Sequence, residues 1–482
     1  MKNYKMWIGG EWVDAVSGKT YTAVNPATGE PIASIPLGDK ADVDKAVAAA
    51  RKAYAVWSKV PQSERCGIML QIASALKKRV DELVEVEILD HATPVKFAKN
   101  MAAEAGTHFE YAAMVTRGFW SETVPVNRNH KLYLQREPRG VCAAIVPWNT
   151  PIPMSTQKLS GSLSTGNACV LKPPSVDSLP SLKLAEIIED TGLLPKGLLN
   201  VVTGPGGVVG EALASHPGVN MVSFTGSCEV GKRIMSCASA TVKHLGLELG
   251  GKNPFIVFED VDVDAVVAKA VFASTLNSGM VCASPGRYYL HEKIHDEFVE
   301  KFVKALKNVV VGDPNDEKTD MGPVVSAEHR DRVEYYIKKG IEEGANLLLG
   351  GKRPTQPPLN KGFFVMPTVF TGITPEMTIY REEIFGPVAC IVKPFKTEEE
   401  VIAAANDNTF GLGASVWAGD TGRAMRVANE IEAGTVWIND HMFIAPDLPW
   451  GGFKESGLGK EGSVLGILEY TQLKVVSVNL NK

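Results

Sequence analysis

The sequence has no long apolar run and no strong excess of either charge. No segment reaches the roughly 18 consecutive apolar residues of a membrane-spanning helix. Its first residues, MKNYKMWIGGEWV, are polar or glycine where a signal peptide carries its apolar core. The formal net charge is -5, without the basic excess that nucleic acids or anionic membranes require. We therefore expect a cytoplasmic protein that acts on small molecules and binds neither nucleic acid nor membrane.

Paired cysteines are also missing. The seven cysteines are scattered, and no CxxC pair suggests a zinc ribbon or a redox dithiol. Most cysteines of a large protein are small buried apolar residues, and Cys282 within NSGMVCASPGR could be one of them. A thiol in a loop of small residues could also be a nucleophile, because a substrate can approach it closely.

One segment, HEKIH at 291–295, matches the HExxH pattern of zinc peptidases. That chemistry requires both histidines on one helix face and a third ligand beyond them. Here RYYLHE is typical of a strand, and the helical pattern starts only near His295, so we expect the histidines at a strand-to-helix junction. No metal site is expected. A zinc peptidase stays as a third possibility, to be tested by metal analysis and chelator sensitivity.

Length and hydrophobic content indicate more than one domain. The chain has 482 residues, 45% of them hydrophobic, which is more than one core usually holds. Strand patterns open the chain and helical patterns follow from Ala41. From Gly140 to about Asp440, apolar β-branched strands alternate with helices. This alternation predicts an α/β protein with parallel sheets covered by helices, the usual frame for a nucleotide.

Two motifs at predicted strand ends suggest where a nucleotide would bind. SFTGSCEVGK leaves a strand at Gly226 and enters a helix near Gly231, so backbone amides and a helix N-terminus could meet a pyrophosphate. The GxGxxG pattern is not matched, and an ordinary turn is the simpler explanation of this segment alone. Lys172 in VLKPPSVDS follows another strand, where ligands bind in open α/β sheets, although a solvated surface lysine is the ordinary alternative.

Two further polar residues need an explanation. Glu248 lies in the apolar strand of LELGGKNP, and a buried carboxylate is costly unless it is paired or functional. Asn149 in VPWNTPIPM could donate its amide to an oxyanion or simply hold a turn. On these residues alone, the structural explanations stay open.

In their order along the chain, the motifs resemble those of the aldehyde dehydrogenase superfamily over essentially the whole sequence. The matching segments are NPATGE, PWN, VLKP, LNVVTG, FTGS, LELGGKNP, GMVC, EEIFGPV, FGLGASVW, GTVWIND and PWGGFKESGLGKEG. The resemblance implies a Rossmann-like cofactor domain, an α/β catalytic domain and a small β arm for a homodimer or homotetramer. The implied segments are 1–119 and 139–250 for the NAD(P)-binding domain, 251–467 for the catalytic domain, and 120–138 with 468–482 for the oligomerisation arm.

The resemblance also implies catalytic roles. Cys282 would attack the aldehyde carbon to form a thiohemiacetal, while Asn149 and a backbone N–H hold the oxyanion. After hydride transfer to the nicotinamide, Glu248 would activate the water that hydrolyses the thioester to a carboxylic acid. Relatives that transfer the acyl group to coenzyme A generally lack this base, so hydrolysis is favoured.

The implied cofactor contacts lie at strand ends and in EEIFGPV. Many relatives that prefer NAD have glutamate where this chain has Ser175. Loss of that carboxylate removes repulsion toward a 2′-phosphate and makes NADP or dual use credible. The implied cofactor-binding residues are Ile145, Pro147, Trp148, Lys172, Ser175, Thr225, Gly226, Ser227, Gly231, Glu383 and Phe385.

The substrate class follows from the implied tunnel lining. Thr150 and Gln157 replace residues that are aromatic in many short-chain aldehyde enzymes, so we expect a wider tunnel and a medium or bulky apolar aldehyde, aromatic or terpenoid. A small-aldehyde or semialdehyde dehydrogenase and a catalytically silent structural or binding protein remain alternatives. The segment LDHATPV also departs from a Gly-Lys pair common in relatives, which we expect to affect packing near the pocket mouth. The implied tunnel residues are Thr150, Met154, Gln157, Met280, Val281, Ala283, Ile444 and Trp450.

Overall fold

A mixed sheet in the order β22-β12-β11-β8-β9-β10-β2-β3 forms the first of two α/β units in the computed structural model, which describes residues 1–119 and 121–481. Its central strands are parallel and mostly buried, as expected of a sheet covered by helices. The strand order reverses at β8, because β9 lies on one side of it and β11 on the other. Ligands of open α/β sheets bind at such a point. The central strands are β8 (Val141–Ile145), β9 (Ala168–Lys172), β10 (Leu199–Val201), β11 (Met221–Thr225) and β12 (His244–Glu248).

Short strands at the start of the chain extend this unit, as their alternating pattern predicts. The pair β2 and β3 joins the sheet edge antiparallel to β10, and β1, β5 and β4 form a separate small sheet. Their bounds are β1 (Lys2–Asn3), β2 (Met6–Ile8), β3 (Glu11–Val13), β4 (Thr20–Val24) and β5 (Pro31–Pro36).

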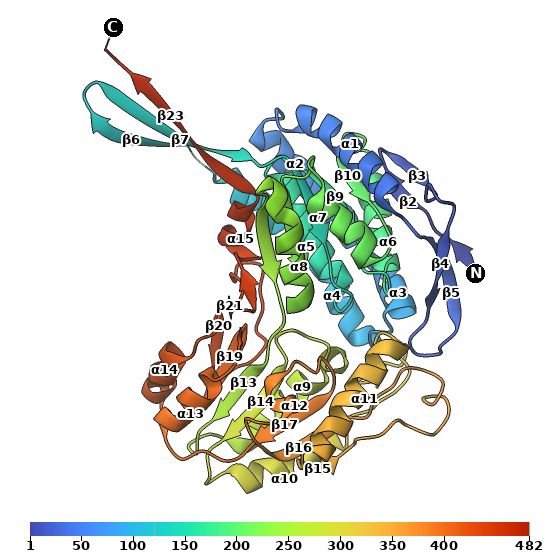
Figure 1. Ribbon diagram of the computed structural model, residues 1–482, viewed down its shortest axis with the longest axis vertical. Helices are drawn as coiled ribbons and strands as arrows, with labels where there is room; N and C mark the ends of the chain where they lie inside the picture. Colours follow the sequence, from blue (N-terminus) through green and yellow to red (C-terminus); the bar gives the residue numbers. More distant parts are fainter. Residues whose placement is uncertain (120, 482) are drawn as a thin grey trace.

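Helices pack around the first sheet (Figure 1). The first begins where Asp39 and Asp42 exchange side-chain and backbone hydrogen bonds, a capping box that satisfies free N–H groups. Among the described residues, no helix is both long and apolar enough to cross a membrane. The helices are α1 (Lys40–Trp57), α2 (Gln62–Lys78), α3 (Val80–Asp90), α4 (Val95–Arg117), α5 (Pro151–Ser164), α6 (Leu179–Glu189), α7 (Glu211–Ser215) and α8 (Cys228–Ala238).

The second unit has its own sheet, in the order β15-β16-β17-β14-β13-β19-β20, with antiparallel pairing only of β15 with β16 among the pairs described. Its strands are β13 (Asn253–Val257), β14 (Pro285–Leu290), β15 (Asn346–Leu349), β16 (Thr368–Ile373), β17 (Val388–Val392), β19 (Gly413–Trp417) and β20 (Thr435–Ile438). Its helices are α9 (Val263–Thr275), α10 (His295–Leu306), α11 (Ala327–Glu342), α12 (Thr378–Arg381), α13 (Glu398–Asn406) and α14 (Thr421–Glu430).

An arm of three antiparallel strands projects from the first unit (Figure 1). It consists of β6 (Glu122–Asn127), β7 (His130–Pro138) and β23 (Thr471–Asn479), so segments far apart in sequence meet there. Trp120 and Lys482, which the sequence also assigns to the arm, lie outside the described residues.

The end of the chain returns to the first unit before it enters the arm. The segment that the sequence assigns to the catalytic domain supplies β22 (Gly457–Leu458), which pairs with β12 at the edge of the first sheet. The division by residue ranges is therefore not strict at this point. The remaining elements are β18 (Phe410–Gly411), β21 (Phe453–Lys454) and α15 (Ser463–Glu469).

A buried ion pair ties this returning segment to the first unit. Lys158 of α5 is 0% exposed, and its ammonium bonds the carboxylate of Glu461 and, at 2.8 Å, the hydroxyl of Ser223 on β11. Ser223 in turn donates to Glu461 at 3.2 Å. Because each charge is compensated inside the protein, removal of either one would leave the other buried and unpaired.

We expect Lys158→Met to destabilise the protein by about 3–5 kcal/mol, because Glu461 would remain buried without its partner. The measurement is thermal unfolding, in which the midpoint should fall by several degrees. Lys40→Met is a matched control: Lys40 pairs with Asp44 on the surface, and loss of an exposed pair costs less than about 1 kcal/mol. Equal shifts in the two variants would contradict the role of the buried pair.

Candidate active site

The carboxyl ends of parallel strands bring predicted site residues to one edge of the first sheet. The register aligns Ile145 of β8 with Lys172 of β9 and with Phe224 of β11. It also aligns Thr225 of β11 with Glu248 of β12. Because parallel strands end at the same edge, the proposed cofactor and base positions share one side of the unit.

The loop that carries Cys282 starts with three consecutive residues in the left-handed backbone region. Asn277 has a φ of 48°, Ser278 of 56° and Gly279 of 73°. Non-glycine residues rarely adopt this conformation, and a run of them requires support from its surroundings. The Ser278 hydroxyl donates to the Gly322 carbonyl at 2.8 Å. A Cβ at Gly279 would lie 2.4 Å from the backbone of a neighbouring loop, so glycine is required there.

The side chain of Asn149 contacts this loop directly. It is buried, and its Nδ2 donates to the Met280 carbonyl at 2.9 Å. Asn277 Nδ2 donates in turn to the main-chain oxygen of Asn149 at 2.6 Å. An amide nitrogen carries two hydrogens, so the Asn149 side chain keeps a second N–H for a ligand oxygen near the Cys282 loop.

Cys282 is half-buried and held at its backbone. Asn253 Nδ2 donates to the Cys282 carbonyl at 2.7 Å. Burial, and then the negative charges of Glu383 and Glu248, raise the pKa of the Cys282 thiol to about 12. The free protein therefore holds this thiol protonated at neutral pH, and its reaction requires that the proton be taken up by another group.

Glu248 is 2% exposed at the end of β12. Neither of its carboxylate oxygens has a hydrogen-bond partner within residues 1–119 and 121–481. Burial, and then the charge of Glu461, raise the pKa of Glu248 well above its usual value. A Cβ at Gly451 would lie 2.7 Å from Glu248 Oε1, so only glycine leaves room for the carboxylate. A buried carboxyl without partners costs folding free energy, which favours a chemical role over a structural one.

The EEIFGPV segment of the second unit contacts both the first unit and the connection after β12. Glu383 Oε1 accepts from the Gly251 N–H at 2.9 Å, and burial raises the pKa of Glu383 to about 7. The ring of Phe385 meets Trp148, after β8, edge to face with the centroids 5.2 Å apart. The segment thus places a titratable carboxyl near Cys282 and an aromatic wall beside the β8 end.

The region around Lys172 fits the adenosine half of a dinucleotide. Lys172 is 4% exposed, and burial lowers the pKa of its ammonium to about 8. A cation that has lost its hydration is stabilised by ribose or phosphate oxygens of a ligand. Ser175 Oγ donates to the Gly204 carbonyl at 2.9 Å, so no carboxylate stands there. Ile145 is buried and Pro147 half-buried on the neighbouring strand end.

The turn after β11 fits a pyrophosphate. Gly226 N–H donates to the backbone of β12 at 3.0 Å, and Ser227 Oγ accepts from the third residue of α8 as its N-cap. The helix N-terminus carries a partial positive charge that favours an anion. A Cβ at Gly231 would lie 2.6 Å from the Leu249 side chain, so this glycine permits close packing of α8 on the sheet.

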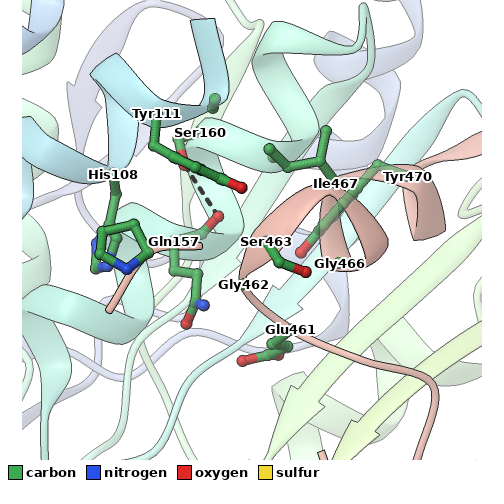
Figure 2. Close-up of a pocket in the computed structure, with 13 residues that line it drawn as sticks. His108, Tyr111, Gln157, Ser160, Glu461, Gly462, Ser463, Gly466, Ile467 and Tyr470 are labelled. Carbon is green, nitrogen blue, oxygen red and sulfur yellow. Dashed lines mark hydrogen bonds between the residues drawn. The ribbon is translucent and has the colours of Figure 1, made fainter. Parts of the chain in front are cut away.

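The predicted tunnel residues differ in how open they are to solvent. Met280 and Ala283 are fully buried, Met280 within the apolar core of the second unit, so a passing substrate does not reach their side chains in this structure. The Trp450 ring lies beside Trp437 with centroids 6.0 Å apart. Gln157 lines a small cavity between α4, α5 and α15 (Figure 2). The other members are half-buried or exposed: Thr150, Met154, Val281 and Ile444.

Three residues that support the site were not found by sequence reasoning. Asn253 directly follows LELGGK, the only local signal for it. His329 Nε2 donates to the Phe385 carbonyl at 2.7 Å, and His441 Nε2 donates to the Ala283 carbonyl at 2.9 Å. Both histidines lie far along the chain from their partners, so no local pattern marks them.

The HEKIH segment is arranged as predicted. His291 follows β14 and His295 begins α10, so the two rings lie on either side of a strand-to-helix junction. Nε2 of His291 is 3.7 Å from Glu259, and Nδ1 of His295 is 2.8 Å from Asp296. Within the described part of the chain, no group of three histidine, cysteine or acidic side chains is placed to hold a metal ion. The geometry does not support a zinc peptidase.

Comparisons with known proteins cover almost the whole chain. A model described as "Aldehyde dehydrogenase family" matches residues 12–476. A betaine aldehyde dehydrogenase from Bacillus subtilis (strain 168) is 41% identical over 479 residues, or 98% of this chain and 97% of the relative. The structure of a betaine aldehyde dehydrogenase from Staphylococcus aureus in complex with NAD+ gives a TM-score of 0.97 at 36% identity and covers 99% of this chain and 95% of that chain. The structure of a point mutant of that enzyme, also in complex with NAD+, gives a TM-score of 0.98 at 35% identity. It covers 100% of this chain and 98% of that chain.

Alkylation by iodoacetamide, mapped to Cys282 by mass spectrometry, reports its ionisation. Because the thiolate reacts, we expect the rate in the free protein to rise about tenfold per pH unit from about pH 7 to 10. Glu383→Gln removes a negative charge, lowers the pKa of Cys282 and should raise the rate several-fold at about pH 8.5. Glu382→Gln, a change at the neighbouring exposed carboxylate, is the control and should leave the rate unchanged. A plateau below about pH 9, or no effect of Glu383→Gln, would argue against this electrostatic arrangement.

Proposed function

This chain belongs to the aldehyde dehydrogenase family, and we propose that it oxidises a medium-sized or bulky apolar aldehyde, aromatic or terpenoid, to a carboxylic acid with NAD+ or NADP+. The convergence of three groups carries the proposal. The Asn149 amide donates a hydrogen bond to the loop of Cys282, and the negative charge of Glu248 is close enough to raise the pKa of the Cys282 thiol. A nucleophile, an oxyanion donor and a base within one buried region suit acyl transfer to water.

In the proposed reaction, Cys282 loses its proton and attacks the aldehyde carbon. Burial and two carboxylates oppose ionisation of the thiol, so the proton needs an acceptor, and the raised pKa of Glu248 suits it to this task. Negative charge then moves from the sulfur to the aldehyde oxygen. The free N–H of Asn149 and the backbone N–H of Cys282 would donate to that oxygen.

Once the proton that it took from the thiol has passed to solvent, Glu248 would act again when water cleaves the thioester. Its carboxylate oxygens have no hydrogen bonds from described residues, so they can accept a proton from water. Burial raises its pKa well above the usual value of a glutamate, which makes it a stronger base. The attack of this water breaks the bond between carbon and sulfur, releases the carboxylic acid and restores the thiol of Cys282.

The dinucleotide, when bound, supplies the two-electron acceptor of the oxidation. Lys172 would hold the ribose hydroxyls of the adenosine, and the turn at Gly226 and Ser227 would hold the pyrophosphate. Glu383 would bind the second ribose, and Phe385 would pack against the nicotinamide side of the site. Support comes from the buried ammonium at the β9 end and from the helix N-terminus at the switch point of the sheet.

The apolar substrate class is supported by the segment after β20, which packs on the nucleophile loop through His441. Phe443 is 59% exposed and Ile444 54% exposed on this segment, and Trp450 lies beside Trp437 in the same region. Exposed apolar side chains favour an apolar ligand. A small cationic aldehyde is the second candidate, because relatives at 41% and 36% identity are betaine aldehyde dehydrogenases.

We further propose that the arm joins subunits of a homodimer or homotetramer. Leu473 and Val475 of β23 are 55% and 56% exposed. Exposed apolar residues on a projecting strand favour contact with another copy of the chain.

Cofactor reduction with a panel of aldehydes will test the proposed function. We expect wild type to reduce NAD+ or NADP+ with benzaldehyde-like and terpenoid aldehydes at higher kcat/KM than with acetaldehyde or betaine aldehyde. Cys282→Ala should abolish the reaction with all of them, and Cys237→Ala, a change at another partly buried cysteine, should not. A large advantage for acetaldehyde or betaine aldehyde would remove the apolar class. Silence with every aldehyde, and with coenzyme A added, would favour a non-catalytic role.

The residue at position 175 should set the choice of cofactor. We expect Ser175→Glu to lower kcat/KM for NADP+ at least about tenfold relative to NAD+, because a carboxylate would repel the 2′-phosphate. Ser175→Gln adds similar bulk without charge and should keep most of the NADP+ activity. If kcat/KM for NADP+ falls equally in both variants, the bulk of the new side chain rather than its charge is responsible for the loss.

A further inference from the structure

We propose that His91 is a positioning residue for the Asn149 amide and acts through Asn277. His91 directly follows α3 within LDHATPV, where the sequence led us to expect an effect on packing near the pocket mouth. His91 and Thr93 are each 1% exposed, so both side chains pack inside the protein. The ring instead contacts the loop of the nucleophile, with its Nε2 3.0 Å from Asn277 Oδ1.

The partners fix the direction of each hydrogen bond. Asn277 Nδ2 faces the main-chain oxygen of Asn149 at 2.6 Å, and a carbonyl oxygen only accepts. The oxygen end of the Asn277 amide must then face His91. Since that oxygen also only accepts, Nε2 of His91 must carry a hydrogen and donate it. The ring is thus restricted to the forms in which Nε2 is protonated.

Asp177 holds the other side of the ring. Its Oδ2 lies 3.1 Å from His91 Nδ1, within ion-pair distance, and neither of these two atoms has a hydrogen bond of good geometry to the described residues. Either a protonated Asp177 faces a neutral ring, or an ionised Asp177 faces a charged ring. Nε2 keeps its hydrogen in both cases, so the donor to Asn277 is maintained whichever group holds the shared proton.

The surroundings of this pair are buried and acidic. Burial raises the pKa of Asp177 and of Asp90 well above the usual range, and that of Glu87 to about 8. Asp90 accepts from the Leu179 N–H at 2.8 Å, which ties the end of α3 to the start of α6 beside Asp177. Glu87 accepts from Thr93 at 3.0 Å.

A phenol completes the acidic surroundings of Asp177. Tyr21 shares a 2.6 Å hydrogen bond with the hydroxyl of Ser178, the residue after Asp177. Burial, with the charges of Asp90 and Asp177, raises the pKa of Tyr21, which keeps the phenol neutral. The titratable groups near His91 thus come from three segments of the chain and are all acidic or phenolic, without a lysine or arginine in the contacts described.

Loss of the His91 donor would affect the proposed oxyanion donor through Asn277. Without a donor at His91, Asn277 Oδ1 would be buried and unsatisfied, and the Asn277 amide could rotate away from Asn149. Asn149 would then lose the bond to its main chain, and the left-handed start of the Cys282 loop would lose support. This inference rests on the proposed function for the role of the Asn149 amide, but the positions of the hydrogens do not depend on it.

The test compares His91→Leu, which removes the donor, with His91→Gln, whose amide nitrogen can occupy the Nε2 position. Each change is made in the wild type and in Asn149→Ala. Two reactions are followed: cofactor reduction with the best aldehyde, and hydrolysis of 4-nitrophenyl acetate without cofactor. The ester reaction needs the thiol, the base and the oxyanion donors, but no cofactor. His216→Leu, a change at a half-buried histidine that faces Asp44, is the matched control.

We expect His91→Leu to lower kcat about 10- to 100-fold in both reactions with little change in KM, because oxyanion donors act in the transition state. His91→Gln should stay within about threefold of wild type. In the Asn149→Ala background, His91→Leu should add less than about twofold, since the side-chain amide that His91 positions is absent. An equal loss in both backgrounds, or an equal loss in the Leu and Gln variants, would overturn the proposal.

A neutron structure of the wild-type protein gives an answer that depends neither on activity nor on folding of the variants. We expect a deuteron on Nε2 of His91, with the Asn277 amide nitrogen toward Asn149. A bare Nε2 would overturn the proposal. If wild type oxidises no aldehyde, the proposed function fails, and ester hydrolysis and the neutron structure still decide the role of His91.

Discussion

The hydrogen bond from the Asn277 side chain to the main chain of Asn149, at 2.6 Å, is the contact on which the active-site arrangement depends. Asn149 follows β8 of the first sheet, whereas Asn277 precedes the Cys282 loop between β13 and β14 of the second sheet. Neither sheet alone can place an oxyanion donor beside Cys282. The bond also supports the start of the Cys282 loop, where Asn277 and Ser278 have positive φ values that would otherwise be strained. One polar contact thus orients the amide and stabilises the loop.

Burial is the second constraint, and it acts on all the acidic groups of the site in the same direction. It raises the pKa of Cys282, Glu248 and Glu383, so the free protein keeps the proton that the thiol must later lose, and Glu248 is a stronger proton acceptor than a solvated glutamate. Exclusion of water is costly in folding free energy, but it strengthens each interaction with developing charge. Closely packed glycines make this possible, because Gly451 and Gly250 leave room for carboxylates that a Cβ would displace.

The sequence predicted the fold class and the main chemical groups because their signals are local. Apolar strands that alternate with helices specify a parallel sheet, and the ends of such strands place Lys172 and Glu248 on one edge. The roles of His91, His329 and Asn253 are not visible locally, since each bonds a residue far along the chain. Met280 shows the opposite limit: its place beside Cys282 suggested a tunnel wall, but the turn of the loop directs its side chain into the core.

The final part of the chain explains why the site requires the whole protein. After the second sheet is complete, the chain returns to pair β22 with β12, whose last residue is Glu248. The same segment brings Gly451 against that carboxylate and Glu461 against Lys158 inside the first unit. A base at the end of an edge strand would otherwise be open to water, and its pKa would return toward that of a solvated glutamate. The returning segment therefore covers the proposed base. The proposed chemistry of Glu248 is thus coupled to the folding of residues that come more than 200 positions later, a separation that the Gly250–Ser456 hydrogen bond spans directly.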